Sequence, residues 1–149
     1  MMNIELFKTL NILYVENDKE LERNFSQTLN NLFKKVFLSL DGMDALTQFI
    51  QHNNSDEKID VILSEYNIPS LNGLELLLQI RKINHTVPFI FITQETSIDL
   101  LLNSLRYDVT DYFIKPISYS YHFRIISSQI VSFFKKKEIW DKFYNIISK

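Results

Sequence analysis

The sequence predicts an α/β fold in which a doubly wound, five-stranded parallel sheet is covered by helices on both faces. Apolar runs of strand length alternate along the chain with segments of helical periodicity, which is typical of parallel sheets. Such runs also suit strands that are buried on both faces. The 149 residues are 46% hydrophobic and 23% charged, which is enough for one packed domain with at most a short helical appendage.

The five expected strands are short apolar runs. They cover residues 12–15, 36–39, 61–64, 89–93 and 111–114. The chain has only two Gly and three Pro, and four of these five residues flank a predicted strand end: Pro69, Gly73, Pro88 and Pro116. They stand where the backbone has to turn between a strand and a helix.

Helices are expected between the strands. In the first of them, Leu21, Phe25 and Leu29 recur every four residues, which places them on one buried face. Asp18 precedes this helix and can cap its N-terminus. Asp41-Gly42 and Asn72-Gly73 mark turns that lead into two later helices.

Polar side chains follow four of the five expected strands. These segments are Glu16-Asn17-Asp18, Ser64-Glu65-Tyr66-Asn67, Thr93-Gln94-Glu95 and Lys115-Pro116. The carboxyl ends of parallel strands meet at one edge of the sheet, and ligands bind outside that edge. Carboxylates suit Mg²⁺, whereas a hydroxyl and an amine suit a phosphoryl group. The sequence therefore predicts a binding site at this edge.

Residues 10–118 resemble the receiver domain of a two-component response regulator. The resemblance is carried, in order, by NILYVENDKE, DGMDAL, IDVILSEYNIPSLNGLELLLQIRK, VPFIFIT and DYFIKPI. It implies a flavodoxin-like sheet with strand order 2-1-3-4-5 and a role in phosphorelay signal transduction. It also implies a receiver domain over residues 1–118, of which the first nine are a lead-in, and a last receiver helix with an amphipathic extension over residues 119–149.

The family assigns roles to side chains at the strand ends. An acidic pair after the first strand and an Asp after the third hold Mg²⁺, and that Asp accepts phosphate from a histidine kinase. A hydroxyl and a lysine contact the phosphate, and an aromatic residue in the fifth strand reports the switch. By resemblance, these phosphate-contact and switch positions are Thr93, Lys115 and Tyr112, with Gln94 in place of a small residue beside Thr93. Asp108 stands where a Gly usually ends the fourth helix.

Two further departures affect the chemistry of the site. The phosphoacceptor position is Glu65 instead of Asp, and the acidic pair is Glu16-Asn17, so one carboxylate is replaced by an amide. We define the acidic pocket as Glu16, Asn17, Glu65 and Asn67. Loss of one charged ligand weakens Mg²⁺ binding by at least about tenfold. We therefore expect no tightly bound cofactor, and weak Mg²⁺ at most.

The longer side chain of Glu65 carries its carboxylate towards the space that a phosphoryl group would take. An ion pair between Glu65 and Lys115, or between Glu16 and Lys115, is expected in the absence of metal. These features predict an atypical, phosphorylation-independent receiver that works through protein–protein interaction and has no catalytic residues.

Two alternatives use the same residues. One is a conventional Mg²⁺-dependent phosphoacceptor receiver with an unusual acceptor. The other is a metal-dependent phosphatase or hydrolase, but such an enzyme needs a general acid, and Asn67 stands where that acid would be. The three histidines, His52, His85 and His122, fall outside the predicted site.

Residues 119–149 contain neither Gly nor Pro and are longer than one receiver helix requires. An apolar seam repeats at spacings of three and four, and Lys137 interrupts it. The predicted interface residues of this seam are Phe123, Ile126, Ile130, Phe133 and Trp140. We expect a homodimer through this helix, or binding to a histidine kinase or an output domain. The alternative is an extension that folds back as an additional core helix.

The composition restricts the cellular compartment and the classes of partner that we expect for this chain. The absence of Cys excludes disulfides and thiolate metal sites and fits a reducing compartment. Apolar runs are too short to span a bilayer, and the N-terminus lacks signal-peptide features. Residues 1–117 carry 10 basic and 16 acidic side chains, whereas residues 118–149 carry 6 and 2. We expect a cytoplasmic protein that binds neither membranes nor nucleic acid directly.

Overall fold

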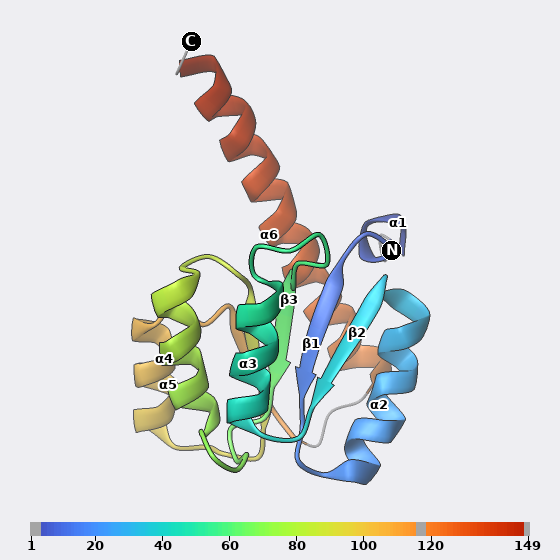
Figure 1. Cartoon of the computed structure of the whole chain (residues 1–149), viewed down its shortest axis with the longest axis vertical. Coiled ribbons are helices and arrows are strands. Elements are labelled where there is room, and N and C mark those ends of the chain that lie inside the picture. Colours follow the sequence, from blue (N-terminus) through green and yellow to red (C-terminus); the bar gives the residue numbers. More distant parts are fainter. Residues whose placement is uncertain (1–3, 116–118, 148–149) are drawn as a thin grey trace.

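A five-stranded, all-parallel sheet lies at the centre of the structure, and the computed structural model describes residues 4–115 and 119–147 (Figure 1). The strands are β1 (Asn11–Val15), β2 (Lys35–Ser39), β3 (Val61–Ser64), β4 (Phe89–Thr93) and β5 (Asp111–Ile114). Their order, β2-β1-β3-β4-β5, confirms the expected topology. All five strands therefore end at the same edge of the sheet.

Six helices are described in these residues. They are α1 (Ile4–Phe7), α2 (Lys19–Leu32), α3 (Gly42–His52), α4 (Gly73–Ile83), α5 (Ile98–Arg106) and α6 (Tyr119–Ile147). One core cluster joins α2 and the first half of α6 to one face of the sheet, and a second joins α3 and α4 to the other face. Figure 1 shows α5 beside α4 on that second face.

The predicted cap at Asp18 and the predicted helix starts at Gly42 and Gly73 are confirmed, and Asp41 and Asn72 are found to be caps as well. The Asp18 carboxylate accepts hydrogen bonds from the backbone N–H groups of Glu20 and Leu21, at 2.9 and 3.2 Å. Asp41 and Asn72 each accept one from the residue three positions later, at 2.7 and 2.9 Å. These bonds satisfy N–H groups that have no partner inside a helix.

The N-terminal lead-in is part of the core, which the sequence reasoning did not anticipate. Phe7 of α1 is fully buried, and its ring lies 5.3 Å from that of Phe33, between centroids. Lys34 donates its backbone N–H to the carbonyls of Phe7 and Leu10. This packing attaches the segment before β1 to the end of α2.

Arg81 connects the segments that lead into β4 and β5, at the amino ends of these strands. Its buried guanidinium donates to the carbonyls of Tyr107 and Asp108, at 2.9 and 2.8 Å, and to those of Asn84 and Val87. Asp108, which stands where the family usually has a Gly, has φ of 56°, in the left-handed region that favours glycine. Burial lowers the pKa of Arg81, and the nearby charge of Asp108 opposes that effect.

The first half of α6 packs against its own sheet, and this corrects two of the predicted interface residues. Ile126 and Ile130 are 0% and 1% exposed in the core cluster that includes α2. They are unavailable to a partner because they cover the sheet face that would otherwise be open. Phe133 is half-buried, and the side chains of Phe123 and Trp140 lie outside the described residues.

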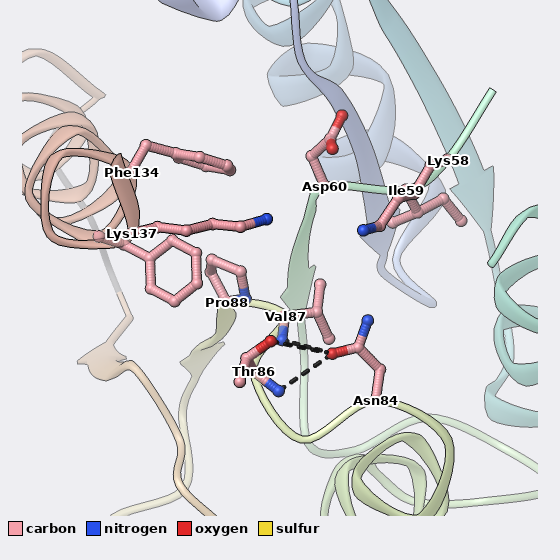
Figure 2. A pocket seen from close by; sticks show the side chains of 10 residues that line it. Lys58, Ile59, Asp60, Asn84, Thr86, Val87, Pro88, Phe134 and Lys137 are labelled. Carbon is pink, nitrogen blue, oxygen red and sulfur yellow. Dashed lines mark hydrogen bonds between the residues drawn. The ribbon is translucent and has the colours of Figure 1, made fainter. Parts of the chain in front are cut away.

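The second half of α6 projects away from the sheet (Figure 1). Where it leaves the body, Phe133, Phe134 and Lys137 line a small hollow with residues before β3 and β4. Figure 2 shows the Lys137 side chain extending towards Asp60. Lys137 thus faces the receiver body instead of simply interrupting a partner-facing seam. In the part of the chain that the structure describes, no helix has the length and hydropathy of a membrane span.

Candidate functional site

Four strand ends bring their polar side chains together, as the sequence predicted. Glu16 follows β1, Glu65 follows β3, Thr93 ends β4 and Lys115 follows β5. These strand ends adjoin an open depression lined by Glu16, Asn17, Asp18, Leu21, Glu65, Asn67, Gln94 and Lys115. The parallel register sets the positions of these ends: Val15 pairs with Ser64 and Thr93 with Ile114, whereas Ser64 pairs with Phe91, so that β4 continues two residues beyond the end of β3.

Lys115 bridges the two carboxylates. Its Nζ lies 2.5 Å from Glu16 Oε1 and 2.7 Å from Glu65 Oε2. The Lys115 backbone N–H donates to the Thr93 carbonyl at 2.7 Å, which extends the β4–β5 pairing beyond the end of β5. The predicted contact between Lys115 and Glu65 or Glu16 is confirmed, and it involves both carboxylates.

The remaining carboxylate oxygens also have donors. Glu65 Oε1 accepts the backbone N–H groups of Tyr66 and Asn67, at 2.7 and 3.2 Å, and the Thr93 hydroxyl. Glu16 Oε2 accepts the Asp18 N–H at 3.3 Å. Each of the four carboxylate oxygens of Glu16 and Glu65 therefore accepts at least one hydrogen bond.

Burial and charge act against each other in this cluster. Glu16 and Glu65 are 3% and 6% exposed. Burial raises the pKa of Glu16, whereas the hydrogen bond and ion pair with Lys115 lower it. The effect of burial is larger, so the pKa is raised. Burial alone would lower the pKa of Lys115, but its bonds to the two carboxylates outweigh that effect and raise the pKa. Lys115 is therefore the positive charge that keeps two buried acids together.

Tyr112 is near enough to Glu65 for the charge of that carboxylate to act on it, and its hydroxyl bonds to the loop after β4. Its hydroxyl donates to the Glu95 carbonyl at 2.8 Å, and its ring centroid is 5.7 Å from that of Phe91. Burial, with the nearby charges of Glu95 and Glu65, raises the pKa of Tyr112 to about 12. The hydrogen bond joins the predicted switch position to the loop that follows Thr93.

Asn17, Asn67 and Gln94 are exposed on the rim of the depression. Asn67 Nδ2 donates to Glu95 Oε1 at 3.4 Å. Among the residues described, no group of three or more acidic, His or Cys side chains is arranged to hold a metal ion. With Lys115 between the two buried carboxylates, these donors do not fit the Mg²⁺ site that the family implies.

Two residues support the site through contacts that the sequence did not predict, although both residues were named in the sequence analysis. The Ser64 hydroxyl donates to the Glu65 carbonyl at 2.8 Å. A Cβ on Gly73 would lie 2.6 Å from Phe91 Cε1 and 2.7 Å from the Glu65 carbonyl oxygen, so only glycine lets α4 begin this close to Glu65. The glycine was predicted as a helix start, but its tertiary contact has no periodic signal in the sequence.

The same fold occurs in solved receiver domains. A CheY-like receiver domain protein from Methanospirillum hungatei JF-1 superposes with a TM-score of 0.76 at 20% identity, covering 86% of this chain and 98% of that one. A receiver domain protein from Clostridium thermocellum gives 0.75 at 21% identity, covering 88% and 98%. At these identities the likeness concerns the fold alone.

Sequence comparison adds the family. Transcriptional regulatory protein MalR of Bacillus subtilis is 28% identical over 143 residues, which are 94% of this chain and 57% of MalR. Response regulator ArlR of Staphylococcus saprophyticus is 32% identical over 105 residues, 70% of this chain and 45% of ArlR. The chain thus spans about half the length of these relatives. Because residues 12–126 match the response regulator receiver domain, the chain belongs to that family of signalling domains.

Proposed function

We propose that this chain is a receiver that signals without phosphorylation, and that the Glu65 carboxylate takes the place of a phosphorylated side chain. The observation that carries the proposal is the 2.7 Å ion pair between Glu65 and Lys115 in a site where Thr93 also donates to Glu65. In the family, these hydroxyl and lysine positions contact the phosphoryl group. Here they already contact a permanent negative charge.

The surroundings of Glu65 also oppose phosphotransfer. A nucleophilic carboxylate oxygen needs a free lone pair and a nearby cation that neutralises the incoming phosphoryl group. Glu65 Oε1 already accepts three hydrogen bonds, and Oε2 is paired with Lys115. Asn17 supplies no charge for a metal, so we propose that Mg²⁺ binds weakly at most.

The test is the intact mass of the protein after incubation with acetyl phosphate and Mg²⁺. We expect the wild-type mass to stay unchanged. The matched control is the Asn17→Asp/Glu65→Asp double variant, which restores both family carboxylates and should gain one phosphoryl group. A stoichiometric adduct on the wild-type chain would contradict the proposal.

A conventional phosphoacceptor receiver is the second candidate. The observation that favours it is the presence of both phosphate-contact positions, Thr93 and Lys115, in direct contact with the acceptor side chain. The same experiment separates the two. Under this alternative, the wild-type adduct forms, and peptide mapping places it on Glu65.

We further propose that the output is a protein contact made through α6. Its projecting half carries Ile139 and Ile146, which are 68% and 72% exposed. A second copy of the chain, an output domain or a histidine kinase could bury them, and we favour a homodimer because apolar side chains on a helix exposed to water promote self-association. A cytoplasmic setting is part of this proposal.

A further inference from the structure

The acidic pocket already contains a cation. The Lys115 ammonium contacts one oxygen of each buried carboxylate, at 2.5 and 2.7 Å. Two buried carboxylates at this distance from one atom would repel each other unless a positive charge lay between them. The chain supplies that charge itself, from the residue directly after β5.

The hydrogen bonds to the other two oxygens fix the carboxylates in place. Glu65 Oε1 is bonded to two backbone N–H groups and to Thr93, and Glu16 Oε2 to the Asp18 N–H. The oxygens that remain, Glu16 Oε1 and Glu65 Oε2, both face Lys115 Nζ. Without the ammonium, one hard cation could contact both oxygens, with water completing its coordination.

We infer that the Lys115 ammonium is the resident cation of the acidic pocket, in the place where the family's chemistry would require a divalent metal. This deepens the proposed function and rests on its assignment of Glu65. The proposed function predicts only that the wild type binds metal weakly. The inference adds that replacing Lys115 by a neutral side chain should create a site for a divalent cation.

The probe is Mn²⁺, titrated into the full chain by calorimetry, with the free ion followed by electron paramagnetic resonance. We expect Lys115→Met to bind Mn²⁺ at least about tenfold more tightly than the wild type, since it loses a competing charge and leaves two buried carboxylates unpaired. Lys115→Arg keeps the charge and should bind no better than the wild type. Lys35→Met, which removes a surface ion pair with Glu57, is the remote control.

A second variant tests whether the gain in Mn²⁺ affinity depends on both carboxylates. Lys115→Met/Glu16→Gln keeps only Glu65, so its Mn²⁺ affinity should fall back towards that of the wild type. If Lys115→Met is unfolded, the readout is far-ultraviolet circular dichroism during Mn²⁺ addition. Recovery of the folded spectrum supports the inference, and no recovery contradicts it.

Two other results would overturn the inference. One is a Lys115→Met variant that folds but binds Mn²⁺ no better than the wild type. The other is a wild-type chain that binds Mn²⁺ as tightly as the variant, since the lysine would then not compete. Neither result depends on phosphate uptake, so a failure here is separate from a failure of the acetyl phosphate experiment.

Discussion

At the scale of single residues, the position of each site side chain follows from the strand that precedes it. The contact between Glu65 and Lys115 could be predicted because parallel strands β3 and β5 end at one edge. The sequence left open whether Lys115 would contact Glu16 or Glu65, since that depends on side-chain packing at the edge. The structure gives both contacts.

Glu16 makes stability depend on pH in a defined direction. Burial raises its pKa above the ordinary 4.5, so the folded state binds a proton there more tightly than the unfolded chain does. Protonation of Glu16 therefore stabilises the folded state. This stabilisation is complete below pH 4.5 and is lost as the pH rises through the raised pKa of the folded state. The ion pair with Lys115 favours the charged form of Glu16 and so makes this loss of stability smaller.

Glu16→Gln removes this titration. We expect the wild type's free energy of unfolding, relative to that of the variant, to decrease as pH rises from about 4 to about 8. Urea denaturation at a series of pH values measures the difference. A difference that increases with pH would mean that the ion pair outweighs burial at Glu16.

At the scale of elements, the sequence predicted α6 as one long helix but assigned its apolar faces incompletely. Apolar residues recur on more than one side, and periodicity alone does not decide which side meets the sheet. The fold decides it, because Ile126 and Ile130 fill the core beside α2, while Ile139 lies beyond the body and is exposed. The predicted seam was therefore wrong where it overlaps the receiver body.

This division of α6 gives opposite expectations for two matched substitutions. Ile139→Asp should leave the domain folded and weaken self-association, because the residue is exposed on the projecting half. Ile130→Asp should lower the free energy of unfolding by about 3 kcal/mol or more, because it buries an unpaired charge. Sedimentation velocity over a concentration series measures the first effect, and urea denaturation the second.

The dimer is contradicted if the wild-type chain stays monomeric at high concentration. If Ile139→Asp self-associates as strongly as the wild type, the contact lies on another surface. The next candidate surface is then the hollow between α5 and β5, where Ile98, Leu101 and Ile114 are exposed.

At the scale of the whole molecule, the fold class and all five strands were predictable from alternating patterns. Three of the strands have the predicted bounds, and β1 and β2 each begin one residue earlier. Strand order came from the family resemblance, since periodicity carries no information about which strands are neighbours. The burial of Phe7 could not be predicted in the same way, because a four-residue helix is too short for a periodic pattern.

The Arg81 guanidinium has a consequence for how the molecule opens. Its bonds join the end of α4 to the end of α5 and to the entry to β4, so α4 cannot separate from either segment without breaking a buried or part-buried hydrogen bond. The backbone N–H groups of Val109 and Thr110 should therefore exchange with solvent together, in one cooperative event. Arg81→Lys cannot reproduce the planar fork, and we expect it to accelerate both exchange rates by more than about tenfold, as hydrogen exchange mass spectrometry or NMR would measure. Unequal acceleration of the two sites would mean that the turn at Asp108 opens on its own.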